Sequence, residues 1–101
     1  MSTVNIHAVI TPRPEFAAQV EQEMRTMVQH SRQEEGNLSY DLLREEKDGQ
    51  VRYHVQERYR DMAAVEAHRA SEHYQAYRAK AGDWFSEPPQ VAVLTEVDVA
   101  G

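Results

Sequence analysis

The chain contains no cysteine, and this absence excludes several kinds of chemistry at once. Disulfides, thiolate catalysis, iron–sulfur clusters and cysteine-based zinc sites all need that residue. The sequence also has no glycine-rich phosphate loop, no dinucleotide-binding fingerprint and no nucleophile-elbow serine. Any chemistry must therefore come from acid–base groups, an apolar cavity and the substrate itself.

Basic patches and long hydrophobic runs are absent as well. The net charge is −6 and there is no basic patch of the kind that neutralises a nucleic-acid backbone, so we expect no nucleic-acid partner. No apolar run approaches the length of a membrane span, and the N-terminal MSTVNIH lacks the regions of a signal peptide. We therefore expect no membrane association and a cytoplasmic location. The length of 101 residues predicts a single domain over 1–101.

The periodicity of the apolar residues predicts an α+β fold. Asp48-Gly49 indicates a hairpin, Asp61 and Ser71 are suitable helix N-caps, and Gly36 is a natural helix end. The expected elements are a strand over 3–11, a helix over 15–34, strands over 38–45 and 51–59, helices over 62–70 and 72–81, and a strand over 90–99. This βαββαβ order predicts a ferredoxin-like four-stranded antiparallel sheet with helices on one face.

The other face of the predicted sheet is only partly polar. It carries Val9, Leu43 and part of the last strand beside polar residues. A mixed face of that size usually contacts another surface, and a second copy of the same sheet is the simplest candidate. We therefore expect a homodimer.

Glu57 stands out because it is a carboxylate on an apolar strand face. By alternation it lies with Tyr53 and Val55 on the face assigned to the helices. Burial there penalises the charged form of a carboxylate unless a partner compensates. His68 is the expected partner, because it shares the apolar stripe of its helix with Val65. Two interpretations remain open: a catalytic pair, or a structural pair that anchors the helix to the strand.

Tyr59 and His73 are further candidates for the same site. Tyr59 lies on the same strand face as Glu57, where a phenol either hydrogen-bonds a substrate oxygen or packs with its tip in water. His73 follows the presumed cap in the first turn of a helix, which favours a neutral imidazole and bound anions. The alternative interpretation is that His73 is a surface residue of that first turn with no role in the site. His68 and His73 lie five residues apart across a helix break, which does not favour a metal site.

Four other aromatic residues have less specific patterns. Tyr74 and Tyr77 have helical spacing, which is typical of core positions. Trp84 and Phe85 are expected in a loop, where they would either cover a pocket or seal a dimer interface.

Taken together, several short segments resemble the antibiotic biosynthesis monooxygenase superfamily. The resemblance covers nearly the whole chain, and it rests on Glu34-Glu35-Gly36-Asn37-Leu38, Tyr40-Asp41, Leu43, Glu57-Arg58-Tyr59, Glu66-Ala67-His68 and Ser71-Glu72-His73-Tyr74. It implies a ferredoxin-like protomer that dimerises through its sheet into an α+β barrel, with a pocket between sheet and helices. The recurring acidic residue and helix histidine of the family map onto Glu57 and His68. Small members of the family include quinol monooxygenases and an isomerase that acts on the phosphorylated breakdown product of autoinducer-2. Tyr59 stands where many monooxygenase members have tryptophan, and Glu72 where proline is common. Tyr59 and the Glu-Glu-Gly-Asn-Leu run are similar to the isomerase branch.

The resemblance implies a cofactor-independent monooxygenase that needs no metal, flavin or haem. Its substrate would be a quinol or a polyketide-like aromatic, and its second reactant O2. In this hypothesis His68 is the base, Glu57 orients it, and Tyr59 and His73 steer the substrate oxyanion.

Three alternatives remain. One is an isomerase of a small phosphorylated hydroxyketone, which would need an anion site near the helix start at Ser71 with Arg58 or Arg69. Another is haem degradation, as in some relatives. The third is a dimeric, non-catalytic binding module in which Glu57 and His68 only join helix to sheet.

Overall fold

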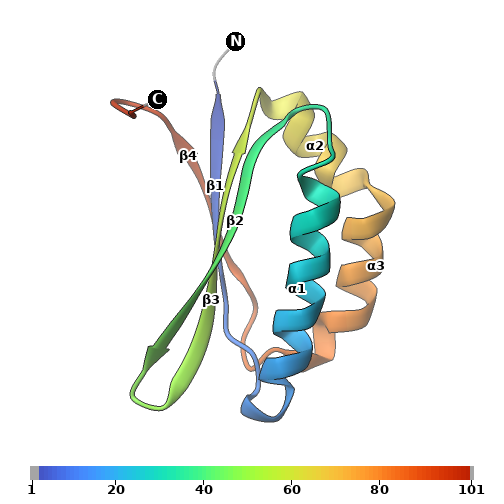
Figure 1. Ribbon diagram of the computed structural model, residues 1–101, viewed down its shortest axis with the longest axis vertical. Helices are drawn as coiled ribbons and strands as arrows, with labels where there is room; N and C mark the ends of the chain where they lie inside the picture. The colour runs from blue at the N-terminus through green and yellow to red at the C-terminus, as the bar shows by residue number, and fades with distance from the viewer. Residues whose placement is uncertain (1–2, 101) are drawn as a thin grey trace.

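The computed structural model describes residues 3–100 and shows a sheet with helices on one face (Figure 1). The strands are β1 (Val4–Ile10), β2 (Asn37–Lys47), β3 (Gln50–Tyr59) and β4 (Gln90–Thr95), antiparallel in the order β2-β3-β1-β4. The helices are α1 (Ala17–Ser31), α2 (Met62–Ala70) and α3 (Glu72–Ala81), with 3-10 turns at η1 (Pro14–Phe16) and η2 (Gly82–Trp84). The predicted ferredoxin-like α+β fold is confirmed.

Two predicted boundaries were wrong by three or four residues, whereas the others lie within two residues of the structure, and hydrogen bonding explains both. The first helix ends at Ser31 rather than at residue 34, because the next amides bond three residues back: Gln33 N–H to His30 O at 3.2 Å and Glu34 N–H to Ser31 O at 3.1 Å. The last strand ends at Thr95 rather than at residue 99. Among the described residues it pairs with β1 alone, and that pairing begins at Val4, opposite Thr95.

The turn between β2 and β3 is the predicted Asp-Gly hairpin. Asp48 and Gly49 have φ of 54° and 76°, and Lys47 pairs with Gln50 across them. Two left-handed residues in a two-residue loop are the signature of a type I′ turn, whose twist matches that of the flanking strands. This turn sets the register that brings Tyr53, together with Val55, Glu57 and Tyr59, to the helical side.

The helical layer covers the sheet unevenly. Buried side chains of α1 and α2 pack on the inner faces of β1 and β3; they are Val20, Met24, Met27 and Val28 from α1, and Ala64 and Val65 from α2. Val91 and Val93 of β4 share that inner face, since they pair with Ala8 and Ile6, yet each is 55% exposed. A space therefore remains between β4 and the helices.

No helix within residues 3–100 covers the outer face of the sheet (Figure 1). Leu43 and Leu94 on that face are each 47% exposed. The homodimer through this face stays a prediction. Among the described residues, no helix is long and apolar enough to cross a bilayer.

Gly36 has a packing role that the sequence did not reveal. It lies beyond the end of α1, is buried and lacks a left-handed φ, so backbone freedom does not explain it. A Cβ at this position would overlap the Cβ of Ala64 on α2, well inside van der Waals contact. The Gly36 carbonyl also accepts the Arg60 amide at 2.9 Å, just before α2 begins. Gly36 thus lets the chain after α1 approach the helix that carries His68.

We expect Gly36→Ala to lower the free energy of unfolding by about 1–3 kcal/mol, because the extra methyl overpacks a buried contact. Urea denaturation measures the effect. Gly82→Ala is the matched control, since no atom lies within 4 Å of its added Cβ and its stability should change by less than about 0.5 kcal/mol. Adding Ala64→Gly to Gly36→Ala should recover part of the loss. Equal stability of the Gly36 and Gly82 variants would contradict this account.

Candidate active site

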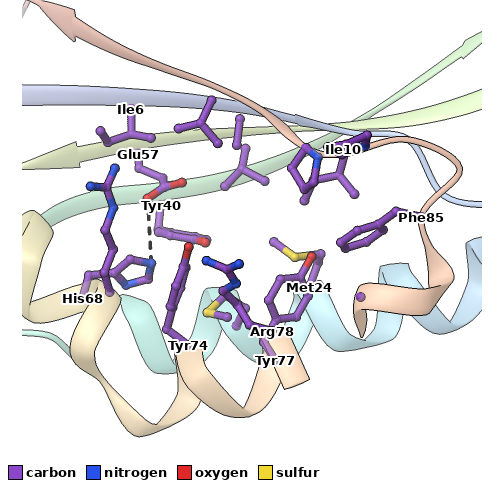
Figure 2. Close-up of a pocket in the computed structure, with 18 of the residues that line it drawn as sticks. Ile6, Ile10, Met24, Tyr40, Glu57, His68, Tyr74, Tyr77, Arg78 and Phe85 are labelled. Atoms are coloured by element: carbon purple, nitrogen blue, oxygen red, sulfur yellow. Dashed lines mark ion pairs between the residues drawn. The ribbon is translucent and has the colours of Figure 1, made fainter. Parts of the chain in front are cut away.

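A cavity of about 820 Å³ occupies the space between the sheet and the helices (Figure 2). Its sheet wall is mainly apolar and includes Ile6, Ala8, Ile10 and Val55. Met24 of α1 and Phe85, in the segment before β4, close one end, while Glu57 and His68 lie at the other. A mainly apolar cavity with a few polar groups is the usual form of a small-molecule site.

Glu57 enters the cavity from β3 as a buried carboxyl group, 8% exposed. Burial raises its pKa to about 7, although the hydrogen bond from Tyr59 and the charge of Arg69 act in the opposite direction. The Tyr59 hydroxyl donates to Glu57 Oε1 at 2.7 Å. Near neutral pH this carboxyl group can therefore both give and take a proton.

His68 reaches the cavity from α2, directly opposite. Asp61 caps this helix by accepting the Ala64 amide at 2.9 Å, which fixes the start of α2 and turns Val65 and His68 toward the sheet. His68 Nε2 lies 4.0 Å from Glu57 Oε1, the contact drawn in Figure 2. Burial lowers the pKa of His68 below its usual 6.5, despite the opposing effect of Glu34. The imidazole is therefore neutral at pH 7.

Glu34 contacts the ring nitrogen of His68 that faces away from Glu57. Its Oε2 lies 2.7 Å from His68 Nδ1 and 2.5 Å from His73 Nε2. When Nδ1 donates its proton to Glu34, the lone pair of Nε2 is left facing Glu57 and the cavity. The break between α2 and α3 makes this convergence possible: Ser71 ends one helix and caps the next by accepting the Tyr74 amide at 3.3 Å.

The same three residues could hold a metal ion. One ligand atom from each of Glu34, His68 and His73 lies within 4.8 Å of the other two, although the sequence spacing of the histidines did not favour such a site. Two imidazoles and a carboxylate suit several divalent transition metals. Glu34 Oε2 also contacts His68 Nδ1 and His73 Nε2 directly. The three side chains can therefore satisfy one another by hydrogen bonding without a metal ion.

The four predicted site residues occupy two different layers. Glu57 and His68 line the cavity, whereas Tyr59 and His73 are not in its wall. Tyr59 is fully buried behind Glu57, and His73 contacts Glu34. The contact that orients His68 comes from Glu34 rather than from Glu57, which makes no hydrogen bond to the ring.

Sequence reasoning missed the remaining functional candidates. Glu34 was noted only within the Glu-Glu-Gly-Asn-Leu run, and no local pattern joins it to histidines 34 and 39 residues away. Tyr74 and Tyr77 pack against the core, as their spacing indicates, but they also line the cavity. Tyr74, Tyr77 and Arg78 have the spacing of residues on one side of a helix. This pattern could have indicated that they line the same cavity. Phe85 lines the cavity, which agrees with the first of its two predicted roles, covering a pocket.

Trp84, the neighbour of Phe85, has a different role. It stacks on Phe16 with ring centroids 6.0 Å apart and does not line the cavity.

We expect Glu34→Gln to lower stability and activity together. The amide oxygen can still accept from both imidazoles but carries no negative charge, so both hydrogen bonds weaken and the free energy of unfolding should fall by about 1–3 kcal/mol. Urea denaturation and a turnover assay measure the two effects. Glu35→Gln is the matched control, because the neighbouring side chain is 92% exposed. If the Glu35 variant lost as much as the Glu34 variant, the role of Glu34 would be refuted.

Fold and site together define a class: a ferredoxin-like protein with a substrate-sized cavity and buried acid–base groups. The family model described as antibiotic biosynthesis monooxygenase matches residues 3–80, and the chain belongs to that family.

Relatives in several bacteria share most of the chain. "Putative monooxygenase YcnE" of Bacillus subtilis is 39% identical over 93 residues, covering 91% of this chain and 95% of that protein. "Putative monooxygenase Rv0793" of Mycobacterium tuberculosis is 35% identical over 99 residues, covering 98% and 96%. The solved structure of Rv0793 superimposes with a TM-score of 0.91 over 99% of this chain and 100% of that one. PA3566 of Pseudomonas aeruginosa, 28% identical, gives 0.88 over 97% of each.

Proposed function

We propose that the protein is a cofactor-independent monooxygenase that oxidises a quinol or polyketide-like aromatic with O2. The observation that carries the proposal is the cavity of about 820 Å³ with His68 and Glu57 at one end. Its volume suits a ligand of two or three fused rings, since sites for drug-sized molecules span about 300–1,000 Å³. The names of the two bacterial relatives support the reaction class.

The proposed reaction begins with proton removal. His68 Nε2 takes the proton of a phenol or enol, and Glu34 stabilises the resulting imidazolium through Nδ1. Tyr59 and His73 act as positioning residues, because they contact Glu57 and Glu34 and not the cavity. The apolar wall keeps water away from the substrate anion, which raises its reactivity toward O2.

The remaining steps balance without another reductant. The substrate anion transfers one electron to O2, and the radical pair combines to form a carbon–oxygen bond and a peroxide. The peroxide takes up the proton from His68. The substrate carbon then loses its C–H proton as the O–O bond breaks, so that hydroxide leaves and forms water with this proton, and a carbonyl group remains. One oxygen atom enters the product and the other becomes water. Glu57, whose pKa is raised to about 7, can relay protons during these steps.

The isomerase alternative shares the first step, and one observation favours it: Arg69 and Arg78 line the cavity and could bind an anion. A small phosphorylated hydroxyketone would leave much of the cavity empty, so the geometry supports the aromatic substrate better. Solvent deuterium exchange into such a ketone, without oxygen consumption, would reverse this choice.

Oxygen consumption tests the proposed function directly. Hydroquinones and anthrones should be oxidised faster with the protein than without it, and treatment with EDTA should not change the rate. The product should contain one atom from 18O2. The proposal fails if no member of the panel raises oxygen uptake above the uncatalysed rate.

A second copy of the chain is the proposed protein partner. The exposed Leu43 and Leu94 place apolar area on the outer face, where two sheets would meet. Light scattering should give twice the mass of the 11.6 kDa chain. A monomer at micromolar concentration would exclude this partner.

A further inference from the structure

The α3 side of the cavity contains a buried hydroxyl group without a partner. Tyr77 Oη is buried, and among the described residues no atom hydrogen-bonds to it. Burial raises the pKa of Tyr77, so the phenol stays protonated and remains a donor. An unsatisfied buried polar group costs stability, and an oxygen atom of a ligand would remove that cost.

Two arginines line the same cavity without a matching acid. Within residues 3–100, neither Arg69 nor Arg78 has a carboxylate within 4.0 Å. The guanidinium of Arg78 lies over the Tyr74 ring, 6.0 Å from its centroid, which holds it near the cavity. Figure 2 shows Arg78 between Tyr74 and Tyr77, with all three side chains directed into the same space.

The groups on this side are therefore mainly hydrogen-bond donors. A guanidinium offers only N–H groups, and neutral phenols donate one O–H each. The carboxyl groups in the wall are Glu57, beside His68, whose ring centroid lies 5.0 Å from that of Tyr74, and Glu87, which accepts a hydrogen bond from the Thr11 hydroxyl at 3.4 Å. The ligand best matched to such a wall carries acceptors, and an Arg fork matches the two oxygens of a carboxylate.

We propose that Tyr77 and Arg78, supported by Tyr74, form a subsite for a carboxylate on the aromatic substrate. This deepens the proposed function, because it makes the substrate an aromatic acid whose oxidised ring lies toward His68 while its carboxylate lies against α3. The net charge of the chain is −6, so attraction of an anion must come from these local groups and not from the molecule as a whole.

Binding of 2-naphthoate and 2-naphthamide by calorimetry tests the subsite without turnover. The two ligands have nearly the same shape, and neither is a substrate for oxidation. Naphthoate should bind about 10-fold more tightly than naphthamide, and the difference should shrink in high salt. Arg78→Gln should abolish the preference. Arg25→Gln, an equal change of charge at an exposed position of α1, should leave it intact.

Tyr77→Phe separates binding from folding. Removal of an unpartnered hydroxyl should leave the melting temperature unchanged or raise it, while naphthoate binding weakens several-fold. Equal affinity for the two ligands, no binding of either, or the same behaviour of the Arg78 and Arg25 variants would overturn the proposal. These binding results do not depend on oxygen uptake. The subsite can therefore be disproved while the monooxygenase activity is confirmed, and the activity can be disproved while the subsite is confirmed.

Discussion

Replacing His68 with glutamine should reduce kcat/KM for the oxidised aromatic by about 10²- to 10⁴-fold, the usual contribution of a positioned general base. Glutamine can keep a hydrogen bond to Glu34 but has no basic nitrogen to face the cavity. Because burial lowers the pKa of His68, the wild-type base is neutral at pH 7 and ready to accept a proton. Oxygen-electrode kinetics measure the loss.

His54→Gln is the matched control for this variant. His54 lies on the outer face of the sheet, where its Nε2 contacts Glu45 at 2.8 Å, and it does not line the cavity. His68→Ala provides a second comparison, because it leaves a space that added imidazole can fill. Recovery of turnover with imidazole would support a base at this position. Full activity of both His68 variants would show that another group removes the proton.

Replacing Glu57 with glutamine should change the pH dependence of stability. The pKa of Glu57 is about 7 in the folded protein and 4.5 for the unperturbed group, so the folded state holds this proton more tightly. Wild-type stability should therefore fall as pH rises from about 4.5 to about 7, because over this range the unfolded state releases the proton while burial of Glu57 forces the folded state to keep it, which costs stability. Glutamine removes that cost. Relative to wild type, the variant should gain about 2–3 kcal/mol between pH 4.5 and pH 8.

Urea denaturation of both proteins at the two pH values measures this difference, and Glu35→Gln is the exposed control. We also expect Glu57→Gln to stay folded while its turnover falls, by up to about 10²-fold, because an amide cannot relay protons. A difference between the two proteins that does not change with pH would show that Glu57 is ionised normally. An insoluble variant would favour a structural Glu57–His68 pair.

Strand parity was enough to predict the buried face of the sheet. Tyr53, Val55, Glu57 and Tyr59 all lie on the inner face as alternation requires, and the Asp48-Gly49 turn sets their register. Parity works because successive strand side chains point to opposite faces whatever the rest of the chain does. The end of β4 could not be predicted in the same way, because it depends on where the paired strand β1 begins.

The candidate site was predictable only in part. The sequence alone determined the fold, the buried carboxyl group of Glu57 and the position of His68 on the inner side of its helix, because each follows from local periodicity and capping. Tertiary structure alone decided that Glu34 orients His68, that Tyr59 and His73 stand behind the cavity wall, and that Gly36 fits against Ala64. Those contacts join segments far apart in the chain, and whether side chains fill the layer between sheet and helices or leave a cavity depends on how all the elements pack together.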